Sequence, residues 1–424
     1  MKSRRPPLFP ILLVNFIGTL GFSIVIPFLV YLVTRFGGNA VVYGIVGATY
    51  PTFQLIGSPM LGRWSDRIGR RRTLLISQLG TLAAWLLFAL ALALPMRQLV
   101  ELGGFALSLP LAVLFAARAL DWLTGGNISV ANAYLADITE ESERSKNFGR
   151  MGVSSNLGFV IGPALATVLG ALADPERAAV WFAIGISAVA SVLIWRLLPE
   201  SQPCTTLAPH RRGMRRTAGH EPVDCTRVEA ARRSGLREVL AQPAVARLLV
   251  LYFLVFLAFS QFYVSFPVRA AGDLGWSVGR TGTFFATLSV AMVLVQGPLL
   301  SWLSPRVPER LLIFAGSLSL GVAFFMLTST DLVVIFSAAL FFALGNGTMW
   351  PTLQSVLSRA ASPTLQGATQ GYAGAVGSLA NIAGLLVGGV VYARFGGWSF
   401  VGAAATMGLV ALLASLWCRV APRS

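Results

Sequence analysis

Two side chains of opposite charge, Arg118 and Asp121, lie inside a long apolar stretch at residues 108–136. A charge at the centre of a bilayer costs about 2.5–3.5 kcal/mol even on a lenient insertion scale, so such residues are functional candidates by default. Three positions apart on a helix, the two side chains share a face and partly neutralise each other. This pattern predicts a proton or substrate relay; the alternative is a permanent ion pair with a structural role.

A second group of charges forms a short turn between two apolar stretches, residues 44–63 and 73–95. Gly62 would let the end of the first helix pack closely against a neighbour, and Gly69 permits a sharp reversal of the backbone. A cluster of arginines would fix the turn on the cytoplasmic side of a membrane. The polar and glycine positions of this turn are Gly62, Asp66, Arg67, Gly69, Arg70 and Arg71.

The composition is that of an integral membrane protein. The 424 residues are 55% hydrophobic and 12% charged, whereas soluble domains carry about 25% charged residues. The net charge of +16 is concentrated in loops, so it does not indicate a nucleic-acid partner. The expected partners are a small-molecule substrate, protons and the lipid bilayer, and we expect a monomer without a cofactor.

Twelve stretches are about as long as the ~20 apolar residues that a spanning helix needs. They are 8–33, 44–63, 73–95, 108–136, 149–172, 179–198, 245–268, 281–303, 310–329, 332–356, 368–393 and 397–418. The sequence therefore predicts an all-α integral membrane protein with twelve transmembrane helices in two six-helix bundles, at 1–198 and 244–424, joined by a linker at 199–243. Excess Lys and Arg on the face shared by the termini predicts that both termini are cytoplasmic in the inner or plasma membrane.

The two halves repeat. Six residues of the first half of the chain align with identical or similar residues 239 positions later in the second half. The pairs are Pro59 with Pro298, Leu61 with Leu300, Ser65 with Ser304, Arg67 with Arg306, Ile68 with Val307, and Arg71 with Arg310. Pro305 stands opposite Asp66, so the second copy has lost its acid.

The linker holds Cys204, His210, His220 and Cys225. Their spacing fits none of the usual zinc-ligand pairs, so no metal site is predicted. A mobile basic loop that lies along anionic lipid is the better interpretation.

The 62–71 turn resembles the G-x-x-x-D-R-x-G-R-R signature of the major facilitator superfamily, between its second and third helices. Residues 118–137 resemble the fourth helix of its tetracycline-type and multidrug proton antiporters. Gly158-Phe-Val-Ile-Gly162-Pro163 resembles the G-x-x-x-G-P motif of the same branch. The resemblance implies pseudo-symmetric halves with the substrate site between them near mid-membrane, and a proton-transfer role for Arg118.

The resemblance also implies a gate. Asp137 is expected to pair with Arg70, and Asp66 to face a helix start in the other half, where the helix N-terminus favours a negative charge. Together with the rest of the 62–71 turn, these residues would hold the outward-facing state. Gly18 stands where an acid is common in the family, which leaves Asp121 with Arg118 as the leading site of proton coupling.

Polar and aromatic side chains on the predicted helices could line a cavity for an amphipathic, mostly apolar substrate. Their alternative role is helix–helix hydrogen bonding and packing. The candidates are Asn15, Phe22, Gln54, Asn127, Asn156, Gln261, Tyr263, Asn346 and Gln354.

We therefore predict a secondary active transporter that exports small amphipathic compounds or drugs by alternating access, driven by protons. The alternatives are an uptake or export carrier for a specific metabolite and a non-transporting membrane sensor. The sequence contains no H-E-x-x-H, G-x-S-x-G or G-x-x-x-x-G-K-[S/T] motif, so an enzyme is not predicted.

Overall fold

Helices account for nearly all of the regular structure in the computed structural model, which describes residues 8–102, 105–124, 127–139, 144–201, 236–360 and 366–417. In the first half they are α1 (Phe9–Arg35), α2 (Ala40–Ile68), α3 (Arg70–Ala93), α4 (Leu109–Thr124), α5 (Asn127–Ile138), α6 (Arg144–Leu169) and α7 (Pro175–Leu197). In the second half they are α9 (Leu236–Leu240), α10 (Pro243–Ala271), α11 (Val278–Leu294), η3 (Val295–Leu299), α12 (Leu300–Leu303), α13 (Glu309–Met326), α14 (Leu332–Ala360), α15 (Gln366–Phe395), η4 (Gly396–Trp398) and α16 (Ser399–Trp417).

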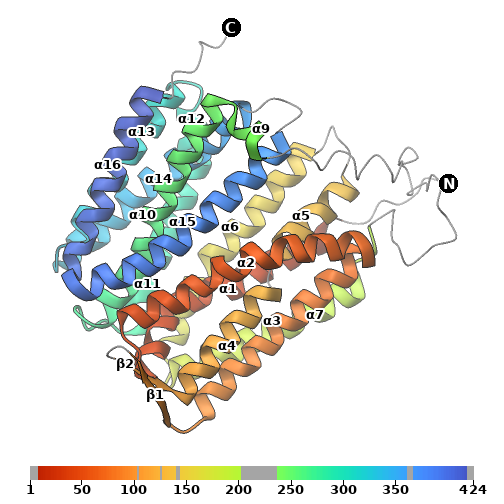
Figure 1. The fold of residues 1–424 in the computed structure, drawn as a ribbon, viewed down its shortest axis with the longest axis vertical. Coiled ribbons are helices and arrows are strands. Elements are labelled where there is room, and N and C mark those ends of the chain that lie inside the picture. Colours follow the sequence, from red (N-terminus) through yellow and green to blue (C-terminus); the bar gives the residue numbers. More distant parts are fainter. Residues whose placement is uncertain are drawn as a thin grey trace, which may run out of the picture. The chain divides into compact units, whose positions relative to one another are not determined.

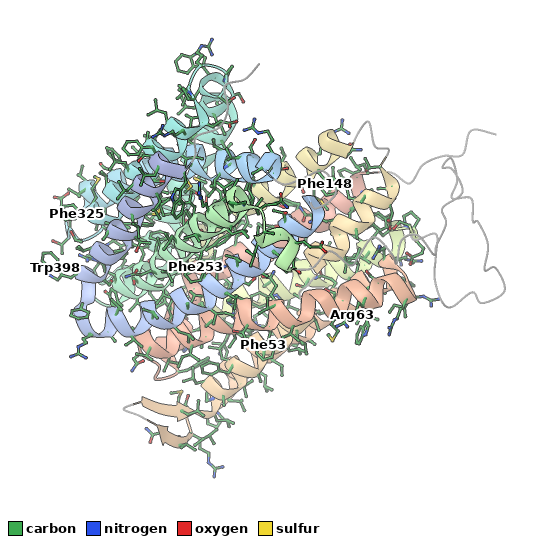
Figure 2. The ribbon with its side chains drawn as sticks, turned by 45° about the horizontal axis from the view of Figure 1, so that its top comes forward. Phe53, Arg63, Phe148, Phe253, Phe325 and Trp398 are labelled. Atoms are coloured by element: carbon green, nitrogen blue, oxygen red, sulfur yellow. The ribbon has the colours of Figure 1, made fainter. Side chains whose placement is uncertain are left out.

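The helices are those of a multi-pass membrane protein. Within the described residues, nine stretches are long and apolar enough to cross a bilayer, and one of them, 371–417, joins two predicted segments. Large apolar side chains such as Phe325 and Trp398 point outward, with exposed fractions of 57% and 73% (Figure 2). The predicted helical membrane fold is confirmed. The count of twelve stays a prediction, because segments 44–63 and 108–136 are not among the nine stretches.

The contacts divide the chain into two units. The first comprises residues 1–28, 52–162 and 172–233. In it, α3 lies against both α4 and α7 (Figure 1). Its apolar core includes Ile11, Leu74 and Tyr134, all buried, with Leu198 from the end of the α7 segment packed against them.

The second unit comprises residues 29–51, 163–171 and 234–424. It contains the C-terminal part of α1, where the Tyr31 hydroxyl donates to the Trp276 carbonyl at 2.7 Å. The end of α6 belongs to it because a Cβ on Gly170 would lie 2.6 Å from the Gly279 nitrogen. The predicted boundaries at 198 and 243 follow the sequence repeat rather than these contacts, and they stay a prediction.

Two local features were not predicted. A hairpin of β1 (Gln98–Leu102) and antiparallel β2 (Phe105–Ser108) precedes α4. The predicted helix 281–303 is interrupted by the π-helix η3, which contains Pro298. Proline has no N–H to donate, and wider π-turns of this kind occur as single-turn bulges inside α-helices.

Candidate functional site: a buried ion pair and a charged turn

The structure brings Arg118 and Asp121 together on α4. The Arg118 Nη1 and Asp121 Oδ2 atoms are 4.0 Å apart, and the two side chains are 7% and 14% exposed. Both charged side chains are therefore largely buried inside the protein, on a helix of a membrane protein. The geometry is that of a loose ion pair rather than of a tight bidentate one.

Helix α3 positions this pair. The Ser77 hydroxyl donates to the carbonyl of Thr124, and a Cβ on Gly80 would lie 2.4 Å from the Thr124 side chain. The absence of a side chain at Gly80 thus lets the two helices approach. The same face of α3 presents Thr81, whose side chain hydrogen-bonds to Asp121. Thr81 was missed in the sequence, because a threonine in an apolar helix usually bonds to its own backbone.

This arrangement can hold and release a proton. An arginine stays charged under all physiological conditions, whereas a carboxylate exists in two states. Protonation of Asp121 would change the net charge of the pair from neutral to +1. Thr81 can accept a hydrogen bond from the acid or donate one to the carboxylate, so it can serve both states.

The charged turn is built around a glycine. Gly69 separates α2 from α3 with φ of 104° and ψ of 153°, a region open almost only to glycine. This reversal places Arg70 so that its Nε lies 3.1 Å from Asp137 Oδ2, and its Nη1 donates to the buried Ser65 hydroxyl. Arg70 therefore ties the end of α5 to the end of α2.

Glu200 completes the turn and was not predicted. Its carboxylate accepts hydrogen bonds from the backbone nitrogens of Arg70, at 2.7 Å, and Arg71, at 3.2 Å. Anions are stabilised at a helix N-terminus by its unpaired N–H groups and its dipole. The next residue, Ser201, donates to Asp137 at 3.2 Å. The available signal was an acid directly after an apolar stretch, but nothing in the spacing linked it to a turn about 130 residues earlier.

Gly62 has no close neighbour among the described residues. A Cβ built on it would meet nothing within 4 Å among the described residues, so its close packing against a neighbour stays a prediction. Arg67 is exposed, as is Arg63, which lies on the outer side of α2 (Figure 2). The side chain of Asp66 lies outside the described residues, and its expected contact with a helix start stays a prediction.

The glycines of the predicted antiporter motif lie against α1. A Cβ on Gly158 would lie 2.8 Å from Thr19 Cβ, and one on Gly162 would lie 2.0 Å from the Ser23 hydroxyl. Ser23 donates to the Gly158 carbonyl at 2.8 Å. The motif therefore creates a close helix contact. Pro163 follows inside α6.

Two residues predicted to line the cavity hydrogen-bond to neighbouring helices, and their part in a cavity stays a prediction. Asn15 donates to the Ser154 hydroxyl at 2.7 Å, and Gln261 donates to the Ser399 carbonyl at 2.6 Å. These two amides occupy the helix-packing role that was the alternative. The hydrogen bonds explain why such polar groups are tolerated on apolar helices.

The other cavity candidates differ in burial. Asn346 places its amide nitrogen 3.7 Å from Met292 Sδ, and its buried Oδ1 has no hydrogen-bond partner among the described residues. Asn156, Tyr263 and Gln354 are exposed, and Gln54 is half-buried. The side chains of Phe22 and Asn127 lie outside the described residues.

No cluster of three or more His, Cys, Asp or Glu side chains suited to a metal occurs in the part of the chain that the structure describes. The four linker residues weighed as zinc ligands, within 204–225, lie outside that part.

Comparison with known proteins gives the family. The sequence profile described as Major Facilitator Superfamily matches residues 11–385 and also 298–424. The tetracycline resistance protein of class E from Escherichia coli is 27% identical over 398 residues, which cover 92% of this chain and 90% of that protein. The human major facilitator superfamily domain-containing protein 10 is 27% identical over 363 residues, covering 84% and 74%.

Solved structures agree on the fold. The crystal structure of the human organic anion transporter MFSD10 has a TM-score of 0.65 at 22% identity, covering 96% of this chain and 98% of that one. The inward-open xylose transporter from E. coli has a TM-score of 0.73 at 16% identity, covering 99% and 97%. With a matching profile along almost its whole length, a helical membrane fold and relatives that transport small molecules, the chain belongs to the major facilitator superfamily and is a membrane transporter rather than an enzyme.

Proposed function

We propose that this transporter exports small amphipathic compounds in exchange for protons. The observation that carries the proposal is the buried Arg118–Asp121 pair, 4.0 Å apart on α4, in a chain similar to tetracycline resistance proteins. An acid inside the membrane that can lose or gain a proton is what exchange requires. Proton entry neutralises Asp121 and removes its attraction for Arg118, which favours the next conformation.

The charged turn would act as the gate. Arg70, Asp137 and Ser65 are linked by direct contacts, and Glu200 fixes the start of α3 beside them. In this proposal the Arg70–Asp137 contact holds the outward-facing state and breaks in each cycle. Asp66 contributes through a helix start, as the family resemblance implies.

Asn346 is our candidate for direct substrate contact. Its buried Oδ1 can accept a hydrogen bond, and no donor satisfies it among the described residues. A buried polar atom that is left unpaired costs about 1–3 kcal/mol, so a substrate donor that reached it would recover that free energy. We expect Asn346→Leu to weaken substrates that carry a hydroxyl or amine more than purely apolar ones.

The orientation follows from charge. Arginines of the 63–72 turn and of the 199–243 linker would lie in the cytoplasm with both termini. We accordingly propose a monomeric protein of the cell membrane. Ser3→Cys and Ser424→Cys, each in a variant whose Cys204, Cys225 and Cys418 are replaced by serine, test this topology with a membrane-impermeant thiol reagent. Protection in intact cells is expected, and labelling would contradict it.

The experiment that tests transport uses proteoliposomes with an imposed proton gradient and a fluorescent amphipathic dye. The parent protein should move the dye, and Asp121→Asn should abolish gradient-driven movement while the dye still binds. Asp174→Asn is the matched control, because Asp174 also pairs with an arginine three residues away, Arg177 at 3.5 Å, but its side chain is 37% exposed. Equal loss in both variants, or full transport by Asp121→Asn, would contradict the role of Asp121.

A second candidate is transport of an organic anion. It is favoured by the likeness to a human protein described as an organic anion transporter, and Arg118 would then receive the anionic group of the substrate. A screen of carboxylate and cationic dyes in the same liposomes distinguishes the two. Preference for anions that is lost in Arg118→Gln would favour this second function.

A further inference from the structure

An apolar groove lies in the second unit, outside the sites described above. Its volume is about 350 Å³. One wall comes from η3 and α12, the other from the first turns of α13, and α14 lies beneath. Its aliphatic lining includes Leu299, Leu303, Val307, Leu311, Ala315 and Leu344.

The groove exists because α14 holds its two neighbours closely at points below it. A Cβ on Gly345 would lie 2.6 Å from the Gly316 carbonyl of α13, and one on Gly347 would lie 2.5 Å from a methyl group of Val295 in η3. Both α13 and η3 therefore contact α14 closely at these glycines. Beyond these contacts, the space between α12 and α13 is open and forms the groove.

The chemistry of the groove suits a hydrocarbon chain. Its two hydroxyl groups are already satisfied, because Ser319 donates to the Phe341 carbonyl at 2.8 Å and Thr348 to the Leu344 carbonyl at 2.7 Å. Leu311 and Leu344 are 51% and 41% exposed, on helices that span a membrane. From Leu311 to Ser319 the groove follows α13 for about 12 Å, a length that takes a large part of an acyl chain.

The end of the groove at the α12–α13 turn is basic. Arg306 and Arg310 are exposed there, while the adjacent acid, Glu309, is engaged by Arg359. Arg306 lies over the ring of Trp302 at 4.8 Å, and Trp302 is itself 57% exposed. Tryptophan and arginine at the end of a spanning helix are typical of the head-group level of a bilayer.

We propose that this groove binds an anionic phospholipid, with one acyl chain between α12 and α13 and the phosphate at Arg306 and Arg310. The aliphatic lining selects a lipid chain over a polar ligand, and the two arginines select an anionic head group over a neutral one. The site is separate from Asp121 and from the Arg70–Asp137 contact in sequence and in chemistry.

The test measures binding of phosphatidylglycerol and of phosphatidylcholine with the same acyl chains to the purified full-length protein, by native mass spectrometry. Arg306→Gln with Arg310→Gln should weaken phosphatidylglycerol about 30-fold, because each basic residue near the head group contributes about fivefold, and should leave phosphatidylcholine unchanged. The matched control is Arg280→Gln with Arg394→Gln, which removes two exposed arginines from α11 and α15 of the same unit. This variant should bind both lipids as the parent protein does.

A second variant tests the groove itself. Ala315→Phe places a ring in the aliphatic channel and should weaken both lipids, whereas Arg306→Lys with Arg310→Lys keeps the charge and should retain most of the phosphatidylglycerol binding. Elution volume and thermal midpoint in detergent establish that each variant is folded. Equal binding of the two lipids, equal loss in the Arg280/Arg394 control, or unchanged binding in Ala315→Phe would overturn the proposal. So would a concentration-dependent dimer that Ala315→Phe abolishes, because a second copy would then occupy the groove.

Discussion

The arginines of the turn between α2 and α3 have different partners from those of its repeat, the turn between α12 and α13. In the first turn, Arg70 contacts the carboxylate of Asp137, and Glu200 accepts hydrogen bonds from the backbone beside it. In the second, Arg306 contacts the ring and carbonyl of Trp302, and Arg310 donates to the Ser415 carbonyl. At the offset of 239, Arg67 and Arg71 correspond to Arg306 and Arg310, whereas Arg70 corresponds to Glu309, which pairs with Arg359. The repeat thus preserved two basic positions and placed an acid at the third, where each turn forms an ion pair with a neighbouring helix.

The backbones of the two turns also differ. At the offset of 239 that aligns the repeats, Gly69 corresponds to Pro308. Gly69 has φ of 104°, whereas Pro308 has φ of −57°. The first turn therefore depends on the absence of a side chain, and the second uses the fixed φ of proline at the start of a helix.

The largest effect is expected for Gly69→Ala. The residue would adopt a backbone region that costs on the order of 1–3 kcal/mol, and its Cβ would lie 2.3 Å from the Glu200 carboxylate. We expect a fall of at least about 2 kcal/mol in unfolding free energy, measured as a lower thermal midpoint in detergent. Pro308→Ala is the matched change in the second turn and should cost less than about 1 kcal/mol; equal losses would remove the distinction.

A double-mutant cycle on Arg70→Gln and Asp137→Asn measures the coupling free energy of the ion pair in the first turn. These side chains are 12% and 21% exposed, so we expect a coupling of about 1–2 kcal/mol together with loss of transport. The same cycle on Glu309→Gln and Arg359→Gln, where the arginine is 50% exposed, should give less than about 1 kcal/mol. A stronger coupling in the second pair would contradict our assignment of the gate to the first turn.

Glu200→Gln should cost about 1 kcal/mol, the usual value of a helix-capping group together with a favourable charge at the N-terminus. Because the amide oxygen can still accept one of the two backbone N–H groups, the loss should be partial. Glu238→Gln, an exposed acid on α9, serves as the control and should leave the thermal midpoint unchanged. A full-sized loss at Glu238 would indicate a general effect of charge.

The smallest effect is expected for Pro305→Asp, which restores an acid at the position that corresponds to Asp66. One charge near a membrane surface is worth about 1 kcal/mol, so phosphatidylglycerol binding should weaken by about two- to fivefold. Pro305→Asn is the neutral control in the same native mass spectrometry measurement. Unchanged binding in Pro305→Asp would place the head group away from this turn.

Much of the fold follows from the sequence. Long apolar stretches predicted the helices because a bilayer leaves few alternatives for the backbone. The proximity of Arg118 and Asp121 follows from their spacing on one helix. Pairing of Arg70 with Asp137 came from the family resemblance, because spacing alone does not bring residues of different helices together.

Other features depend on the tertiary arrangement. Asn15 and Gln261 hydrogen-bond to neighbouring helices, contacts that hydropathy alone does not distinguish from the lining of a cavity. Glu200 reaches the start of α3 from the end of the α7 segment. The hairpin before α4 did have a local signal, since Gly103 and Gly104 lie between two short apolar runs, a pattern typical of a hairpin.

The π-helix η3 has a consequence for how this chain tolerates insertions and deletions. A π-turn accommodates one more residue than an α-turn, so η3 absorbs an extra residue between Leu294 and Leu300. Loss of one residue within 295–299 should therefore restore α-helical geometry and keep Leu303 on its present face. The same loss in the middle of α14 would rotate everything after it by about 100°. The wall of the groove can thus change length by one residue during evolution, whereas its floor cannot.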